Sequence, residues 1–164
     1  PDYALAYIYL GMAYASKGLP DKSIEHFEIA LKLKPDYAEA YNYLANIYMS
    51  KRLSDMAIEH YQTAIKLKPD YAEAYNNLGV AYRSKGSIEK AMEYYNIALR
   101  LKPDYAEAYS NLGNIYYSLN VFDKAIEYYT IALRLRPDFA DARYNLNAAY
   151  YKANRLKQNK LPSQ

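Results

Sequence analysis

Apolar positions along the chain recur at the spacing of amphipathic helices, in blocks that are interrupted at regular intervals. In one typical block the pattern predicts a first helix over about residues 71–84 and a second helix over about residues 89–101. Lys85-Gly86-Ser87 separates the two, and Pro103 cannot continue the second helix. The pattern therefore predicts a pair of helices joined by a short turn.

This helix pair is repeated along the chain. Prolines at positions 1, 35, 69, 103 and 137 are each followed by an aspartate and are separated by 34 residues. A fixed period of about 20 to 50 residues is typical of a repeat array. We assign the repeats to residues 4–37, 38–71, 72–105 and 106–139, a capping helix to residues 140–155 and a polar tail to residues 156–164. Residues 1–3 match the end of a preceding repeat, so we expect the natural protein to continue upstream.

Charged residues fall at the predicted helix ends. Asp104 suits the N-cap of a first helix, with Glu107 three residues on as in a capping box. The second helices begin with acids and end with bases, which complements the helix dipole. We therefore interpret the net charge of +3 as solvated helix ends and predict no nucleic-acid partner.

The composition argues against catalysis. The chain has no cysteine, which excludes disulfides, thiolate metal sites and a cysteine nucleophile. His26 and His60 occupy the same place in successive second helices without an evident acid–base partner, so we interpret them as structural. The acids are spread by the repeat, and no apolar run approaches the roughly 20 residues that cross a bilayer. We predict no enzymatic activity, no cofactor, no metal and no membrane partner, and leave the compartment open.

One motif combines these features: Tyr75-x2-Leu78-Gly79-x2-Tyr82, followed by Ala91-x3-Tyr95 and Ala98. It resembles the tetratricopeptide repeat (TPR), with tyrosine in place of the family's usual tryptophan. The resemblance implies an all-α fold, a right-handed superhelical array of antiparallel helix hairpins, in which the first helices line a concave face and the second helices lie outside.

The positions that the fold does not dictate lie on the concave face, which the TPR family uses to bind peptide segments of other proteins. We take these to be the fifth, sixth and ninth positions of each first helix. The predicted groove is apolar at its N-terminal end and rich in amides beyond it. The candidate peptide-binding residues are Ile8, Tyr9, Met12, Asn42, Tyr43, Asn46, Asn76, Asn77, Val80, Asn111, Asn114 and Asn145.

Asn77, Asn111 and Asn145 share the sixth position. A row of amides can pair with a peptide backbone, since each offers a donor and an acceptor. This row resembles the asparagine ladder in the repeats of O-linked N-acetylglucosamine transferases, whose catalytic domain is absent here. Alternatively, the amides are solvated or bonded between helices. The basic carboxylate clamp of chaperone-binding members is not matched, because Glu107 stands where a cation is needed.

Two functions follow from this pattern. The first is a protein–protein interaction scaffold that binds a peptide segment of another protein in the groove. The alternative is self-association, a homo-oligomer stacked end to end through the uncapped N-terminal repeat, where we expect apolar residues near the end of the array: Leu5, Ile8, Tyr9 and Met12.

Overall fold

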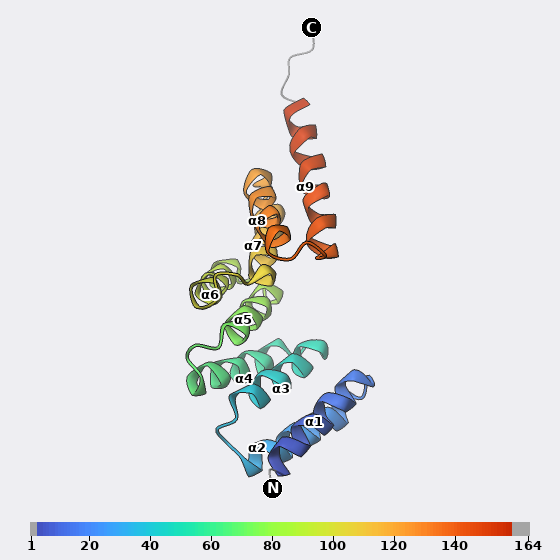
Figure 1. Cartoon of the computed structure of the whole chain (residues 1–164), viewed down its shortest axis with the longest axis vertical. Helices are drawn as coiled ribbons and strands as arrows, with labels where there is room; N and C mark the ends of the chain where they lie inside the picture. The colour runs from blue at the N-terminus through green and yellow to red at the C-terminus, as the bar shows by residue number, and fades with distance from the viewer. Residues whose placement is uncertain (1–2, 159–164) are drawn as a thin grey trace. The chain divides into compact units, whose positions relative to one another are not determined.

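The computed structural model describes residues 3–158, and nine α-helices form within that range (Figure 1). Residue contacts divide the chain into two compact units, the first ending at Tyr94 and the second starting at Tyr95, within α6. The helices are α1 Tyr3–Ser16, α2 Pro20–Leu33, α3 Ala38–Ser50, α4 Ser54–Leu67, α5 Ala72–Ser84, α6 Ile88–Leu101, α7 Ala106–Ser118, α8 Phe122–Leu135 and α9 Ala140–Gln158.

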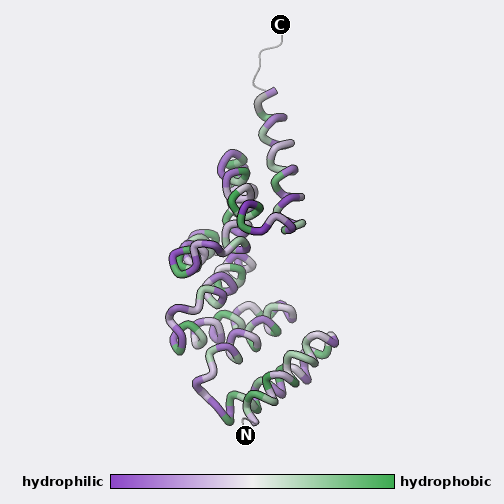
Figure 2. The backbone as a smooth tube through the Cα atoms, viewed as in Figure 1, coloured by the Kyte–Doolittle hydropathy of each residue, from purple (hydrophilic) through white to green (hydrophobic). Residues whose placement is uncertain are grey.

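The first unit stacks helix hairpins. Helix α1 packs along α2 and α3 along α4, while α2 also contacts α3 and α4 contacts α5. Hydrophilic and hydrophobic residues are interspersed along the chain (Figure 2). The predicted helix pairs are present, and one hairpin is covered by the next as expected for a repeat array.

A small residue on the first helix faces an aromatic ring on the second. A Cβ added to Gly11 would lie 3.0 Å from the Phe27 ring, and one added to Gly113 would lie 2.7 Å from the Tyr129 ring. Both rings are almost fully buried. The structure confirms that glycine lets the two helices approach closely while the aromatic ring fills the space beside it.

The turn inside each hairpin contains one residue with left-handed backbone geometry. Gly18 has φ 69° and Gly86 has φ 78°, values that glycine adopts without a steric penalty. Arg52 and Asn120 take the same place in repeats two and four, with φ 62° and 59°. The same turn is therefore built with and without glycine.

The predicted aspartate caps are wrong. Glu39, the capping-box acid of repeat two, instead pairs with Lys68 at 2.8 Å, and Glu107 pairs with Arg136 at 2.6 Å. The aspartates lie one residue before the N-cap. The two glutamates instead pair with the residue that directly follows the second helix of the same repeat. The N-cap residues of α3, α5 and α7 are Tyr37, Tyr71 and Tyr105, and their side chains make no capping hydrogen bond.

The second unit contains the end of α6, the hairpin of α7 and α8, and α9, which packs on α8. Helix α9 is held by small residues, because Ala142 and Ala149 are fully buried against the α8 side. It spans the predicted capping helix and continues past residue 155 to Gln158. Positions 1–2 and 159–164, at the two predicted ends, lie outside the described residues.

Candidate functional site

The predicted site residues all lie on first helices or on α9, and burial divides them by position. The fifth-position side chains Ile8, Asn42 and Asn76 are at most 5% exposed. They therefore act in the packing between repeats. The sixth and ninth positions reach the surface: Tyr9 and Met12 are exposed, and the half-buried members are Tyr43, Asn46, Asn77, Val80, Asn111, Asn114 and Asn145.

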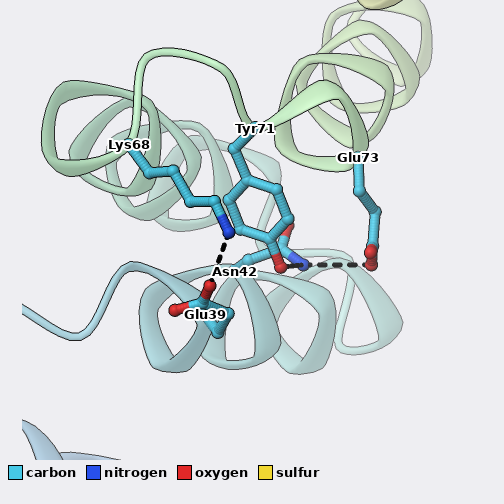
Figure 3. A network of polar contacts seen from close by, with 5 residues as sticks. All are labelled: Glu39, Asn42, Lys68, Tyr71 and Glu73. Carbon is cyan, nitrogen blue, oxygen red and sulfur yellow. Dashed lines mark hydrogen bonds and ion pairs between the residues drawn. The ribbon is translucent and has the colours of Figure 1, made fainter. Parts of the chain in front are cut away.

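A polar network links repeats two and three in the first unit (Figure 3). The Nδ2 of Asn42 donates to Glu73 Oε1 at 3.2 Å and to the Tyr71 hydroxyl at 3.2 Å. An ionised carboxylate only accepts hydrogen bonds, so Asn42 must turn its amide nitrogen toward Glu73. Its Oδ1 consequently faces the other way, toward Asn77.

The orientation of the Asn42 amide determines the orientation of two further asparagines. Asn77 Nδ2 donates to Asn42 Oδ1 at 3.2 Å and to Asn46 Oδ1 at 3.3 Å, and Asn46 Oδ1 also accepts the Tyr61 hydroxyl at 2.5 Å. Asn46 Nδ2 then points away, and it makes no hydrogen bond with the residues that the structure describes. We call Glu73, Asn42, Asn77 and Asn46 the amide chain; its outer end is a donor.

Part of this arrangement recurs in the second unit. Asn114 Oδ1 accepts the Tyr129 hydroxyl at 2.7 Å and Asn145 Nδ2 at 3.0 Å. Asn114 and Asn145 therefore take the places of Asn46 and Asn77. In both units, an amide of one repeat is thus hydrogen-bonded to an amide of the next.

An apolar pocket of about 250 Å³ opens beside Asn46. We call it the α1–α3 pocket, since most of its lining comes from these two helices. No charged side chain of the described residues lines it. The lining residues are Met12, Ala15, Phe27, Tyr43, Asn46 and Ile47, of which three were predicted from the sequence: Met12, Tyr43 and Asn46.

Burial keeps two tyrosine hydroxyls of this region protonated. Burial raises the pKa of Tyr61 and of Tyr71, with the Glu73 charge acting in the same direction. The hydrogen bond from Lys68 lowers the pKa of Glu39, which is therefore ionised at neutral pH. The Tyr61 hydroxyl thus remains a donor to Asn46 in the physiological range.

Aromatic stacks between the two helices of a hairpin were not predicted. The His60 ring lies 5.2 Å from the Tyr48 ring at an interplanar angle of 9°, and Tyr94 stacks on Tyr82 in the same way at 5.3 Å and 10°. Lys90 Nζ lies 5.1 Å from the centre of the Tyr82 ring. His60 and Tyr94 occupy the same position when the second helices are aligned. His60 therefore packs in this structure as an aromatic ring.

Residues 3–158 contain no group of three or more acidic or histidine side chains arranged to hold a metal ion. Within the same range, no helix is long and apolar enough to cross a membrane.

Comparison with known families agrees with this geometry. The tetratricopeptide-repeat profile matches residues 4–37 and 106–139, and a second TPR-repeat profile matches residues 55–82 and 81–120. A search of curated protein sequences found no match. The chain belongs to the TPR family, and its fold is an all-helical TPR solenoid. Proteins built of such repeats are generally non-catalytic scaffolds for protein–protein interaction, and this chain is a scaffold in that general sense.

Solved structures of TPR proteins are similar over most of the chain. The crystal structure of MamA is 33% identical, with a TM-score of 0.73 over 86% of this chain and 82% of MamA. TTC0263, a thermophilic TPR protein of Thermus thermophilus, is 30% identical, with a TM-score of 0.80 over 94% and 84%. PilF of Pseudomonas aeruginosa is 25% identical, with a TM-score of 0.84 over 93% and 69%.

Proposed function

We propose that the chain binds a peptide segment of another protein on the first helices of its repeats. The observation that carries this proposal is the α1–α3 pocket, whose lining includes the predicted site residues Met12, Tyr43 and Asn46. An uncharged apolar pocket with a polar group at its edge is typical of a binding site. The exposed Tyr9 side chain adds an aromatic surface on the same helix as Met12.

Selection from a random peptide library tests the proposal without knowledge of the natural partner. Peptides would be selected on the whole chain, and their binding measured by fluorescence anisotropy. We expect Met12→Asp to weaken binding at least about tenfold, because it places a charge in an apolar pocket. Met56→Asp is the matched control: Met56 is 41% exposed on α4, against 38% for Met12, but lines no part of the pocket.

Binding that is lost in Met12→Asp and kept in Met56→Asp supports the proposed function. Equal loss in the two variants, or the recovery of no peptide whose binding depends on Met12, overturns it. Circular dichroism of both variants checks that the helices are retained.

A second candidate function, self-association through the first repeat, is favoured by one comparison between repeats. Leu10 on α1 is 43% exposed, whereas Leu44 and Leu78, at the same position of α3 and α5, are 2% and 1% exposed. An exposed apolar side chain at this position favours contact with a second copy of the chain.

Sedimentation velocity over a wide range of concentration tests this candidate. We expect a concentration-dependent increase in mass that Leu10→Lys abolishes. Leu33→Lys is the control, because Leu33 is an exposed leucine of the same repeat on α2. A mass that stays monomeric throughout contradicts self-association.

A further inference from the structure

We infer that the α1–α3 pocket receives one uncharged apolar side chain of the bound peptide, while Asn46 Nδ2 donates to a backbone carbonyl beside that side chain. The inference rests on the proposed function and adds the chemistry of the ligand at this site.

The dimensions of the pocket limit what it holds. Pockets that enclose a drug-sized ligand have volumes of about 300 to 1,000 Å³. The α1–α3 pocket, at about 250 Å³, falls below that range and suits a single side chain. Its lining offers Met12, Phe27 and Ile47 as apolar contacts and no charged residue, so a charged side chain would lose its hydration without gaining a partner.

The edge of the pocket has a fixed polarity. Glu73 can only accept, so Asn42 turns its nitrogen toward Glu73, and Asn77 turns its nitrogen toward the oxygens of Asn42 and Asn46. Asn46 therefore turns its oxygen toward Asn77 and its nitrogen away from it. Reversing Asn46 would set its nitrogen against the nitrogen of Asn77. A ligand must therefore supply an acceptor at this point.

A backbone carbonyl is the acceptor that every peptide residue carries. A terminal carboxylate would also accept, but a buried carboxylate needs cations, and neither lysine nor arginine lines the pocket. The site therefore suits an internal residue of a peptide more than its C-terminus.

The probe for this inference is N-acetyl-L-leucine N-methylamide, which has one apolar side chain and two backbone carbonyls. Its binding would be followed by NMR chemical-shift changes of the Met12 and Ile47 methyl groups and of the Asn46 side-chain amide. The glycine analogue lacks the side chain, and the lysine analogue carries a charge. We expect the leucine probe to shift these signals at concentrations where the other two do not.

Asn46→Asp tests the donor separately from the pocket. Both inward partners of Asn46, the Tyr61 hydroxyl and Asn77 Nδ2, are donors, so a carboxylate retains them and loses only the outward donor. We expect this variant to bind the leucine probe about tenfold more weakly or worse. Asn96→Asp makes the same chemical change on the exposed surface of α6 and is expected to bind as the original chain does.

Equal binding of the leucine and lysine probes overturns the inference about the side chain, and unchanged binding by Asn46→Asp overturns the inference about the donor. If either occurs while selected peptides still depend on Met12, the inference is wrong and the proposed function stands. If no peptide depends on Met12, both are wrong.

Discussion

Glu73 on α5 accepts a hydrogen bond from the Asn42 amide on α3 at 3.2 Å, and Asn42 is completely buried. This bond decides how the other amides of the chain are turned, because the carboxylate cannot donate. Asn42 therefore presents a nitrogen to its partners on one side, whereas Asn46 presents an oxygen to both of its inward partners. Replacement by aspartate should therefore change the stability differently at Asn42 and at Asn46.

Asn42→Asp is expected to lower the free energy of unfolding by about 3 kcal/mol or more at about pH 7, because it buries a carboxylate that faces the carboxylate of Glu73. Burial and the neighbouring charge would raise the pKa of the new carboxyl above its ordinary value of about 3.9. The destabilisation is then present above that ordinary value and diminishes as the pH falls toward it. Urea unfolding at about pH 7 and about pH 4 measures both effects.

Asn46→Asp is the control for this prediction. Aspartate keeps an oxygen facing the Tyr61 hydroxyl and Asn77 Nδ2. We therefore expect the free energy of unfolding to change by no more than about 1 kcal/mol. Asn114→Asp should behave in the same way toward Tyr129 and Asn145. Equal destabilisation by Asn42→Asp and Asn46→Asp would show that the amide chain is not oriented as described.

Arg52→Gly is expected to raise the free energy of unfolding by about 1 kcal/mol. Arg52 has φ 62°, a left-handed geometry that costs an ordinary L-residue about 1–2 kcal/mol, and glycine adopts it freely. The greater flexibility of glycine in the unfolded chain offsets part of the gain. Thermal unfolding monitored by circular dichroism gives the change.

The other turns provide controls for this substitution. Asn120→Gly should stabilise less, since asparagine tolerates left-handed geometry better than arginine does. Gly86→Ala should destabilise, because φ 78° strains any residue with a Cβ. A destabilised Arg52→Gly variant would indicate that the arginine side chain contributes more than its backbone geometry costs.

The helix hairpins and their turns could be predicted from the sequence, because each repeat must meet the same physical requirements. Gly113 opposite Tyr129 and the turn at Gly86 are examples: one is needed for close helix approach and the other for left-handed geometry. The aspartate caps could not be placed, because the start of a helix was uncertain by one residue and that shift removes the cap.

The candidate site could be predicted in part. Met12 and Asn46 were placed on the predicted binding face by their position in the helix, and both line the α1–α3 pocket. The burial of Asn42 could not be foreseen, because a polar residue at a predicted groove position is expected to be exposed unless its partners are known. Glu73 comes from the next repeat, and only the packing of the two repeats brings it to Asn42.

A pH-dependent stability is expected from His60. The centre of its ring lies 5.2 Å from that of Tyr48 and 5.9 Å from that of Tyr41. Burial lowers the pKa of His60 below its ordinary value of 6.5, although the charges of Glu59 and Glu28 act in the opposite direction. The folded chain therefore binds a proton at this ring less readily than the unfolded chain does.

The contribution of His60 to stability is present in full above pH 6.5, where the ring is neutral in both states, and is lost as the pH falls from 6.5 toward the folded pKa, because the unfolded chain is protonated first. His60→Tyr, which copies the Tyr94 and Tyr128 stacks of the later repeats, should remove this part of the pH dependence. Urea unfolding at a series of pH values compares the two chains. A variant whose stability falls as steeply with acid as that of the original chain would show that His60 is not the group responsible.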